Sequence, residues 1–144
     1  MKDSLQAGLT YEFRFTVPAN KTVPHLYRES ALFQQMPDVL ATGYLVGLME
    51  WACIEAIKPH LDWPREQSLG THVNFSHIAA TLPGMTITVH VCLEKIEGRK
   101  LTFTLMAHDG IDTISEGTHE RHVIDVERFN AKVANKTKNP TAEE

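Results

Sequence analysis

Three side chains of this sequence could together carry out acyl transfer to water. Glu50 is the single carboxylate in the run Ala41–Cys53, which has the length of a helix and is apolar almost all the way round. A helix without a polar face belongs in the interior of a protein, where an ionised carboxylate needs a partner or a chemical role. Thr42 in the same run and His77 downstream add a hydroxyl and an imidazole, which complete the set of groups that such chemistry needs.

Thr42 and Glu50 are expected to line one groove of this helix without touching each other. They are eight residues apart, which leaves about 80° between them around the helix axis and about 12 Å along it. That separation excludes a direct hydrogen bond within one helix. Two arrangements stay open, because the two groups could approach a substrate from two sides or could pair across a dimer interface.

The helix that positions them is predicted from about Asp38 to Lys58. The Asp38 carboxylate could accept the free backbone N–H groups of the first turn, and Pro59 stops the helix at its other end. Upstream, apolar and polar residues alternate from Leu9 to Val17, which is the period of a half-buried strand. Downstream, strands begin at Ser68, and turns with glycine separate the later ones. The predicted strands after the helix are 71–75, 85–96, 101–105 and 111–126, with short helical segments at 29–35 and 126–133.

This order of elements predicts an α+β protein with the hotdog fold. In that fold one long central helix is wrapped by a curved antiparallel sheet, so that the helix and the sheet cover each other. We expect a single domain over residues 1–138 and a polar tail at 139–144. Because a helix that is apolar on every side needs more cover than one sheet face supplies, we also expect a homodimer.

The loop at residues 18–38 is predicted to act as a lid. It has no clean period, yet it carries large apolar side chains, including Val23, Leu26, Phe33 and Met36. Exposing all of these groups would be unfavourable, so the loop must cover a core, a partner surface or a pocket.

Composition and charge exclude several classes of function. The net charge of −4 gives no basic excess that would indicate a nucleic-acid partner. The longest apolar run is too short for a membrane span, and the N-terminus shows no apolar signal region, so a cytoplasmic protein is predicted. Cys53 and Cys92 are expected to be free thiols. The eight histidines show no metal-ligand spacing, so no metal site is predicted.

Seven stretches along the chain carry a family resemblance: Lys21–Tyr27, Ala41–Cys53, Ser68–Thr71, His77 with Ala79–Thr81, Ala107–Gly110, Gly117–Arg121 and Phe129–Val133. On these stretches the sequence closely resembles the fluoroacetyl-CoA thioesterases, a family of hotdog hydrolases. The resemblance implies hydrolysis of a short-chain acyl-CoA, such as fluoroacetyl-CoA, to the free acid and CoA. Coenzyme A is then part of the substrate, and no separate cofactor is expected.

The resemblance also implies roles for individual residues. The family's catalytic threonine, glutamate and histidine fall on Thr42, Glu50 and His77. Glu50 would act as nucleophile or as general base, His77 would carry a proton, and Thr42 would hold or polarise the reacting groups. The backbone N–H at Gly70 would hold the thioester oxygen, and Arg121 would lie near the CoA moiety.

The lid departs from the family pattern at one position. Fluorine-selective members carry two lid aromatics, whereas this chain keeps Phe33 and has Met36 where the second is expected. Met is flexible, which indicates a looser pocket with less selectivity for fluorine. The alternative function is a non-catalytic protein of the same fold that binds or senses acyl-CoA without hydrolysing it.

Overall fold

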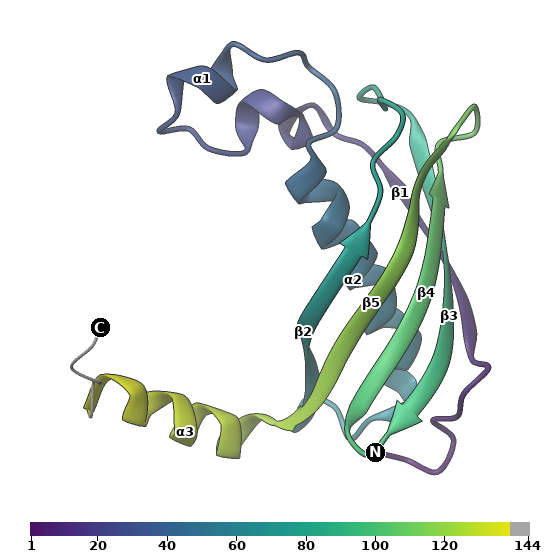
Figure 1. The fold of residues 1–144 in the computed structure, drawn as a ribbon, viewed down its shortest axis with the longest axis vertical. Helices are drawn as coiled ribbons and strands as arrows, with labels where there is room; N and C mark the ends of the chain where they lie inside the picture. The colour runs from purple at the N-terminus through teal and green to yellow at the C-terminus, as the bar shows by residue number, and fades with distance from the viewer. Residues whose placement is uncertain (139–144) are drawn as a thin grey trace.

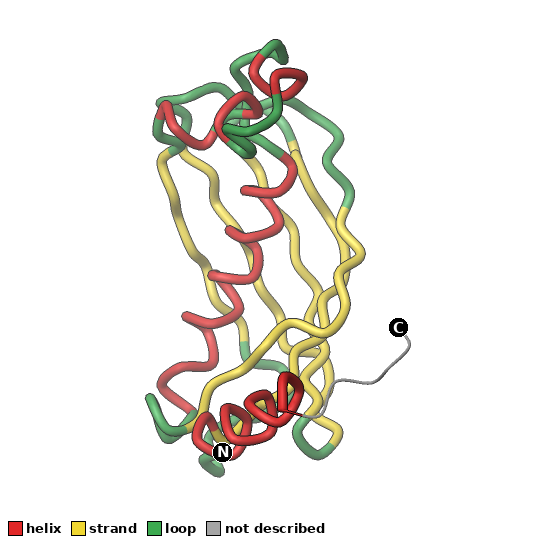
Figure 2. The backbone as a smooth tube through the Cα atoms, turned by 90° about the vertical axis from the view of Figure 1, so that its left-hand side faces the viewer, coloured by secondary structure: helices red, strands yellow, loops and turns green. Residues whose placement is uncertain are grey.

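The structure, a computed structural model, describes residues 1–138. Its sheet is antiparallel, with the strand order β1-β3-β4-β5-β2, and the long helix α2 lies across one face of the strands (Figure 1, Figure 2). This is the predicted α+β arrangement of a central helix wrapped by a sheet. The elements are β1 (Thr10–Thr16), α1 (Ala31–Gln34), α2 (Thr42–Ile57), β2 (Glu66–Phe75), β3 (Thr86–Glu97), β4 (Lys100–His108), β5 (Thr113–Asp125) and α3 (Val126–Lys138).

The core lies between α2 and the sheet. One face of α2 is fully buried, while Gly47 and Trp51 lie on a face that one chain leaves exposed. Burying one large aliphatic side chain on the inner face of α2 stabilises the fold by about 1.5–3 kcal/mol. The largest buried side chains that meet here are Leu45, Met49 and Ile57 of α2 and Ile87, Val89, Leu93, Leu101 and Phe103 of the strands.

β2 is an edge strand with an open side. It pairs with β5 alone, and its residues from Leu69 to Asn74 are exposed. The register shifts by one residue between Gly70 and His72, which marks a bulge in this strand. A long exposed edge of unpaired backbone groups is a template for pairing with another strand.

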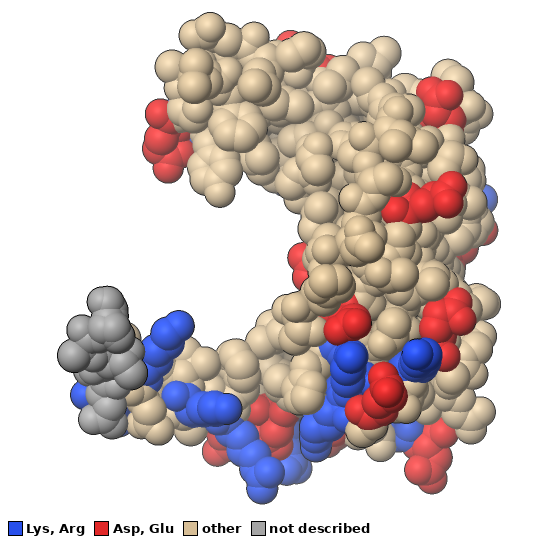
Figure 3. Space-filling view, viewed as in Figure 1, with Lys and Arg blue, Asp and Glu red and all other residues tan. Residues whose placement is uncertain are grey.

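The chain has the shape of a C. The lid segment with α1 and the helix α3 project from opposite ends of the sheet toward the same side, with α2 and β2 between them (Figure 1), and the space-filling view shows a hollow there (Figure 3). Mostly uncharged atoms line this hollow, and Lys and Arg side chains gather toward α3 (Figure 3). No residue of α3 is buried, and Leu32 beside the hollow is 73% exposed.

The structure confirms the predicted strands and helices to within a few residues but corrects the start of α2. Asp38 does not cap this helix, because the N-cap residue is Ala41 and no side chain caps the first turn. The Asp38 carboxylate instead accepts a hydrogen bond from the Thr22 hydroxyl at 3.3 Å. Asp38, which follows Pro37, therefore stabilises the base of the lid and does not cap the helix. The predicted tail at 139–144 lies outside the described residues.

Two glycines should respond in opposite ways to replacement by alanine. A Cβ at Gly117 of β5 would fall 1.9 Å from the Asn74 carbonyl oxygen of β2, so Gly117→Ala must push the edge strand away. Such overpacking costs about 1–3 kcal/mol. A Cβ at Gly47 meets nothing within 4 Å, so Gly47→Ala should stabilise α2 by about 1 kcal/mol.

Urea unfolding of the two variants measures both effects, with Gly47→Ala as the matched control. Equal stabilities of wild type and Gly117→Ala would contradict the close approach of β5 and β2.

Candidate active site

Thr42 and His77 form a hydroxyl–imidazole pair. Thr42 is the first residue of α2, and His77 lies just beyond the end of β2, so the helix start and the strand end bring them together. The distance from Thr42 Oγ1 to His77 Nδ1 is 2.7 Å. Burial lowers the pKa of His77, which keeps the imidazole neutral at pH 7. Its Nε2 atom is buried and has no hydrogen-bond partner among the described residues, which leaves a polar atom available to a ligand.

Glu50 lies two turns further along α2 and is not alone. Its Oε1 accepts a hydrogen bond from Arg121 Nη1 at 2.9 Å and lies 3.9 Å from His119 Nε2. Glu50 Oε2 has no such partner among residues 1–138. The side chain is 35% exposed, so solvent or a ligand can reach the carboxylate.

The residue types in the sequence did not by themselves predict Arg121 as the partner of Glu50. His119 and Arg121 alternate along β5, so both point to the same face of the sheet, toward α2. That alternation was visible in the sequence as a signal for two polar side chains beneath the apolar helix. Arg121 is only 2% exposed, and it makes neither of the surface ion pairs that its neighbours Glu116 and Glu120 could offer. Its predicted proximity to CoA stays a prediction.

Gly70 brings the backbone of β2 against Glu50. Gly70 pairs with Arg121 in the β2–β5 register. A Cβ at this position would fall 2.6 Å from Glu50 Oε1 and 3.1 Å from His119 Cε1. Only glycine lets the strand approach the carboxylate this closely, so Gly70, Glu50 and Arg121 form one cluster.

The lid residues lie beyond the Thr42 end of α2. Leu26 rests on Gly43, where an added Cβ would meet its Cδ2 at 3.1 Å, and Phe33 contacts Tyr27 with 5.6 Å between ring centroids. Val23 is part-buried at the lid base, where its N–H donates to Val39 O, and Met36 is 49% exposed. The structure thus places the predicted lid over the N-terminus of α2.

Within one chain the predicted site residues form two groups rather than one. Thr42 and His77 lie near the lid, whereas Glu50, Gly70 and Arg121 lie about 12 Å further along α2, since each helical residue rises by about 1.5 Å. The expectation that Thr42 and Glu50 do not touch is met.

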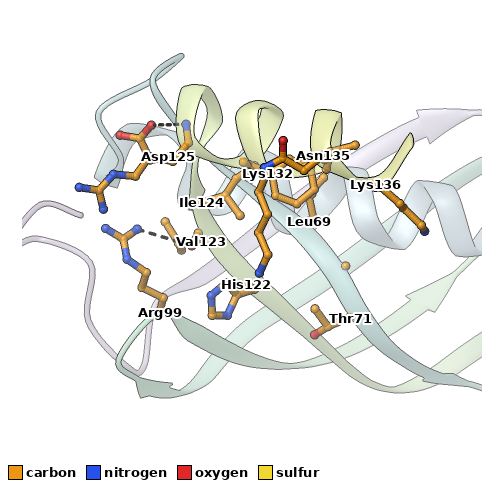
Figure 4. Close-up of a pocket in the computed structure, with 14 residues that line it drawn as sticks. Leu69, Thr71, Arg99, His122, Val123, Ile124, Asp125, Lys132, Asn135 and Lys136 are labelled. Carbon is orange, nitrogen blue, oxygen red and sulfur yellow. Dashed lines mark hydrogen bonds between the residues drawn. The ribbon is translucent and has the colours of Figure 1, made fainter. Parts of the chain in front are cut away.

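A groove beside α3 is separate from the Glu50 carboxylate, because neither Glu50 nor Arg121 lines it. It has a volume of about 960 Å³, lies between α3, β2 and β5, and reaches Gly70. Figure 4 shows Lys132 reaching from α3 across this groove toward His122, with Arg99 at one end. The groove therefore joins an apolar floor to a basic rim.

The chain matches the profile of a known family over residues 20–127, and that family is described as fluoroacetyl-CoA-specific thioesterase. The chain belongs to this family. It is 53% identical over 137 residues to the fluoroacetyl-CoA thioesterase of Streptantibioticus cattleyicolor, an alignment that covers 95% of this chain and 98% of the relative.

Solved structures agree in fold with this family member. A threonine-to-serine variant of the fluoroacetyl-CoA thioesterase in complex with acetyl-CoA superposes with a TM-score of 0.88 at 52% identity, covering 92% of this chain and 99% of that one. A hot-dog-like protein from Thermanaerovibrio acidaminovorans has a TM-score of 0.76 at 18% identity, covering 92% and 93% of the two chains, which shows the hotdog fold.

Two further findings concern the described residues alone. No helix within residues 1–138 is long and apolar enough to cross a bilayer. The same residues contain no group of three His, Cys, Asp or Glu side chains that could hold a metal ion.

His119, which is fully buried, and His77, which is half-buried, should make stability fall as the pH drops below about 6.5. Burial lowers the pKa of both His77 and His119 in the folded chain from the ordinary value of 6.5. The unfolded chain then binds more protons, so their contribution is complete above pH 6.5 and is lost as the pH falls through that value. We expect the melting temperature to decrease between pH 7 and pH 5, measured by calorimetry.

His119→Gln should reduce this decrease, because glutamine does not titrate. Glu66, Asp109 and Asp125, whose pKa values are lowered by hydrogen bonds in the folded chain, act in a separate window below their ordinary values of 4.5 and 3.8. A melting temperature that stays constant from pH 7 to pH 5 would contradict the neutral, buried state of both imidazoles.

Proposed function

We propose that this chain hydrolyses a short-chain acyl-CoA, such as fluoroacetyl-CoA or acetyl-CoA, to the free acid and CoA. The observation that carries the proposal is the joint presence of the Thr42–His77 pair and the Glu50–Gly70–Arg121 cluster in a member of a thioesterase family. Together they offer a hydroxyl, a neutral base, a carboxylate and a backbone N–H at Gly70, which are groups that thioester hydrolysis can use. CoA serves as part of the substrate, and the proposed reaction needs no separate cofactor.

The chemistry starts at the thioester carbonyl. The Gly70 N–H would bind the oxygen that becomes negative in the transition state, an interaction worth about 3–4 kcal/mol in comparable sites. Neutral His77 would take a proton during attack and return it to the departing CoA sulfur. The net reaction consumes one water and releases a carboxylic acid and a thiol.

Two routes remain for the attacking oxygen. In the first, Glu50 uses its open Oε2 either as general base for water or as a nucleophile, while the Arg121 guanidinium holds Oε1. In the second, His77 at 2.7 Å activates the Thr42 hydroxyl itself. Rapid quenching followed by mass spectrometry separates the routes, since only nucleophilic attack leaves an acyl group on Glu50 or Thr42.

We further propose a homodimer in which two β2 edges pair. An antiparallel two-fold pairing centred on His72 places Gly70 of one chain opposite Asn74 of the other, and centring on Val73 places it opposite Ser76. Either register brings the Gly70 cluster of one chain toward His77 of the second copy. The exposed β2 edge and the open hollow of the C support this assembly. The two groups of site residues would then meet across the interface.

The acyl preference and the location follow from the lid and the cysteines. Exposed Met36 supports a loose lid over small acyl groups, with weaker fluorine selectivity than a second aromatic would give. Cys53 and Cys92 are unpaired, which supports a reducing compartment such as the cytoplasm.

The competing function is an acyl-CoA binding protein without catalysis. It predicts a thermal shift with CoA esters and no release of free thiol, whereas the thioesterase predicts thiol release. A thiol-release assay with acetyl-CoA and fluoroacetyl-CoA decides between the two.

Glu50→Gln should remove most of the activity while the protein stays folded, because glutamine keeps the side-chain shape but cannot accept a proton as the carboxylate does. We expect kcat to fall about 100-fold or more, as for loss of a general base. The readout is thiol release by the purified variant, and Glu55→Gln on the same helix is the matched control. Unchanged turnover in Glu50→Gln would remove Glu50 from the mechanism.

Mixing two inactive variants should restore activity if the site is shared between chains. In a dimer of Thr42→Ala with Glu50→Gln, one of the two sites keeps both native groups, so the purified heterodimer should regain about half of the wild-type rate. The variants are co-expressed, the heterodimer is purified with two affinity tags, and thiol release is measured. A heterodimer as inactive as its parents, or a monomer by light scattering, would disprove the shared site.

A further inference from the structure

The guanidinium of Arg121 makes three hydrogen bonds to Ser68 and His119 in addition to its bond with Glu50. Its Nε donates to Ser68 Oγ at 2.8 Å, and its Nη2 donates to the Ser68 carbonyl oxygen at 2.8 Å. Its Nη1 lies 3.0 Å from His119 Nε2 and donates to Glu50 Oε1 at 2.9 Å. Four bonds to three residues leave this planar group little freedom to rotate.

His119 can play its part in only one protonation state. Its Nδ1 lies 2.7 Å from the His72 carbonyl oxygen, which can only accept, so Nδ1 carries the proton. Its Nε2 is then the acceptor for Arg121 Nη1. A protonated imidazole would offer no acceptor and would place a second positive charge against the guanidinium.

The surroundings keep His119 in that state. The side chain is fully buried between the rings of Phe75 and Phe103, with centroid distances of 5.8 and 6.4 Å. The charged or titratable groups that face it are Arg121 on its own strand, Glu50 from α2 and His72 from β2. Burial, Arg121 and the His72 side chain oppose a positive charge on the ring, whereas the hydrogen bond to the His72 carbonyl and Glu50 favour it, and the net effect lowers the pKa of His119.

We propose that His119 and Ser68 are positioning residues, which lock the Arg121 guanidinium and thereby hold Glu50 with Oε1 bound and Oε2 turned to the substrate. The inference rests on the proposed thioesterase function and extends it to two residues that touch no reacting atom. Gly70 completes the arrangement, because it lets β2 close over the pair without displacing it.

The first test compares His119→Leu, His119→Gln and Ser68→Ala in the thiol-release assay. Leucine removes donor and acceptor, and we expect kcat to fall about 10- to 100-fold with KM little changed, as for misplacement of a reacting group by about 1 Å. Glutamine offers one donor and one acceptor and should recover most of the loss. Ser68→Ala should give a smaller decrease, because the Ser68 carbonyl remains. His90→Leu, on β3 away from this cluster, is the matched control.

The second test asks whether His119 acts through Glu50. In the Glu50→Gln background, the further change His119→Leu should alter kcat much less than it does in the wild type. Independent losses that multiply would overturn the proposal. So would a loss in His119→Leu that only follows the unfolded fraction, or a His119→Gln variant no better than leucine.

The third test needs no turnover. Nitrogen-15 NMR of the histidine rings in the full-length protein should show His119 as the neutral Nδ1–H tautomer at pH 7, and Arg121→Lys should change its Nε2 shift. The Nε2–H tautomer or a protonated ring would overturn the inference. If the wild type hydrolyses no acyl-CoA, the positioning role falls with the proposed function, and an intact NMR signature would locate that failure in the function rather than in the hydrogen bonds.

Discussion

The ion pair between Glu50 and Arg121 constrains everything built around it. It lies between an apolar helix and the sheet, where a lone charge would be strongly unfavourable and a pair is tolerated only with further hydrogen bonds. Those bonds come from β2 and β5, since Ser68 and His119 bind the guanidinium on its far side. The strand β2 must therefore stay close to β5, and a side chain at Gly70 would push the Glu50 carboxylate away from its present position. One charge on α2 thus dictates residue types on two strands.

The fold followed from the sequence because its signals were local. Alternation in the strands, glycine turns, Pro18 and Pro59 all act within a few residues of the element that they define. The predicted N-cap of α2 was wrong for the opposite reason. The Asp38 carboxylate could bind either the first turn of the helix or a loop residue, and it binds the Thr22 hydroxyl. No local pattern separates a helix cap from a loop clamp.

The candidate site was only half visible in the sequence. Thr42, Glu50 and His77 could be named from residue type and family resemblance, and the Thr42–His77 contact agrees with that choice. The role of Arg121 as the partner of Glu50 could not, because it depends on which strand lies beneath which turn of the helix. That register is a long-range property, set by β5 pairing with β2 across a separation of about fifty residues in the chain.

The separation of the two groups along α2 connects chemistry to assembly. If the Thr42–His77 pair lay within reach of the Glu50 cluster in one chain, the exposed β2 edge would serve no catalytic role and would only favour aggregation. With the halves apart, the same edge would join them in the proposed homodimer. The hollow in Figure 3 would then be filled by the second chain of the proposed homodimer.

The lid is tied off at its base. Thr22 bridges to Leu40, and the Ala41 N–H donates to the Lys21 carbonyl, so the segment between these points leaves and rejoins the body at one place. Its ends are fixed whatever side chains it carries. Substitutions inside the segment can therefore change which acyl group is accepted without disturbing the sheet. Substrate choice in this enzyme can evolve separately from its chemistry.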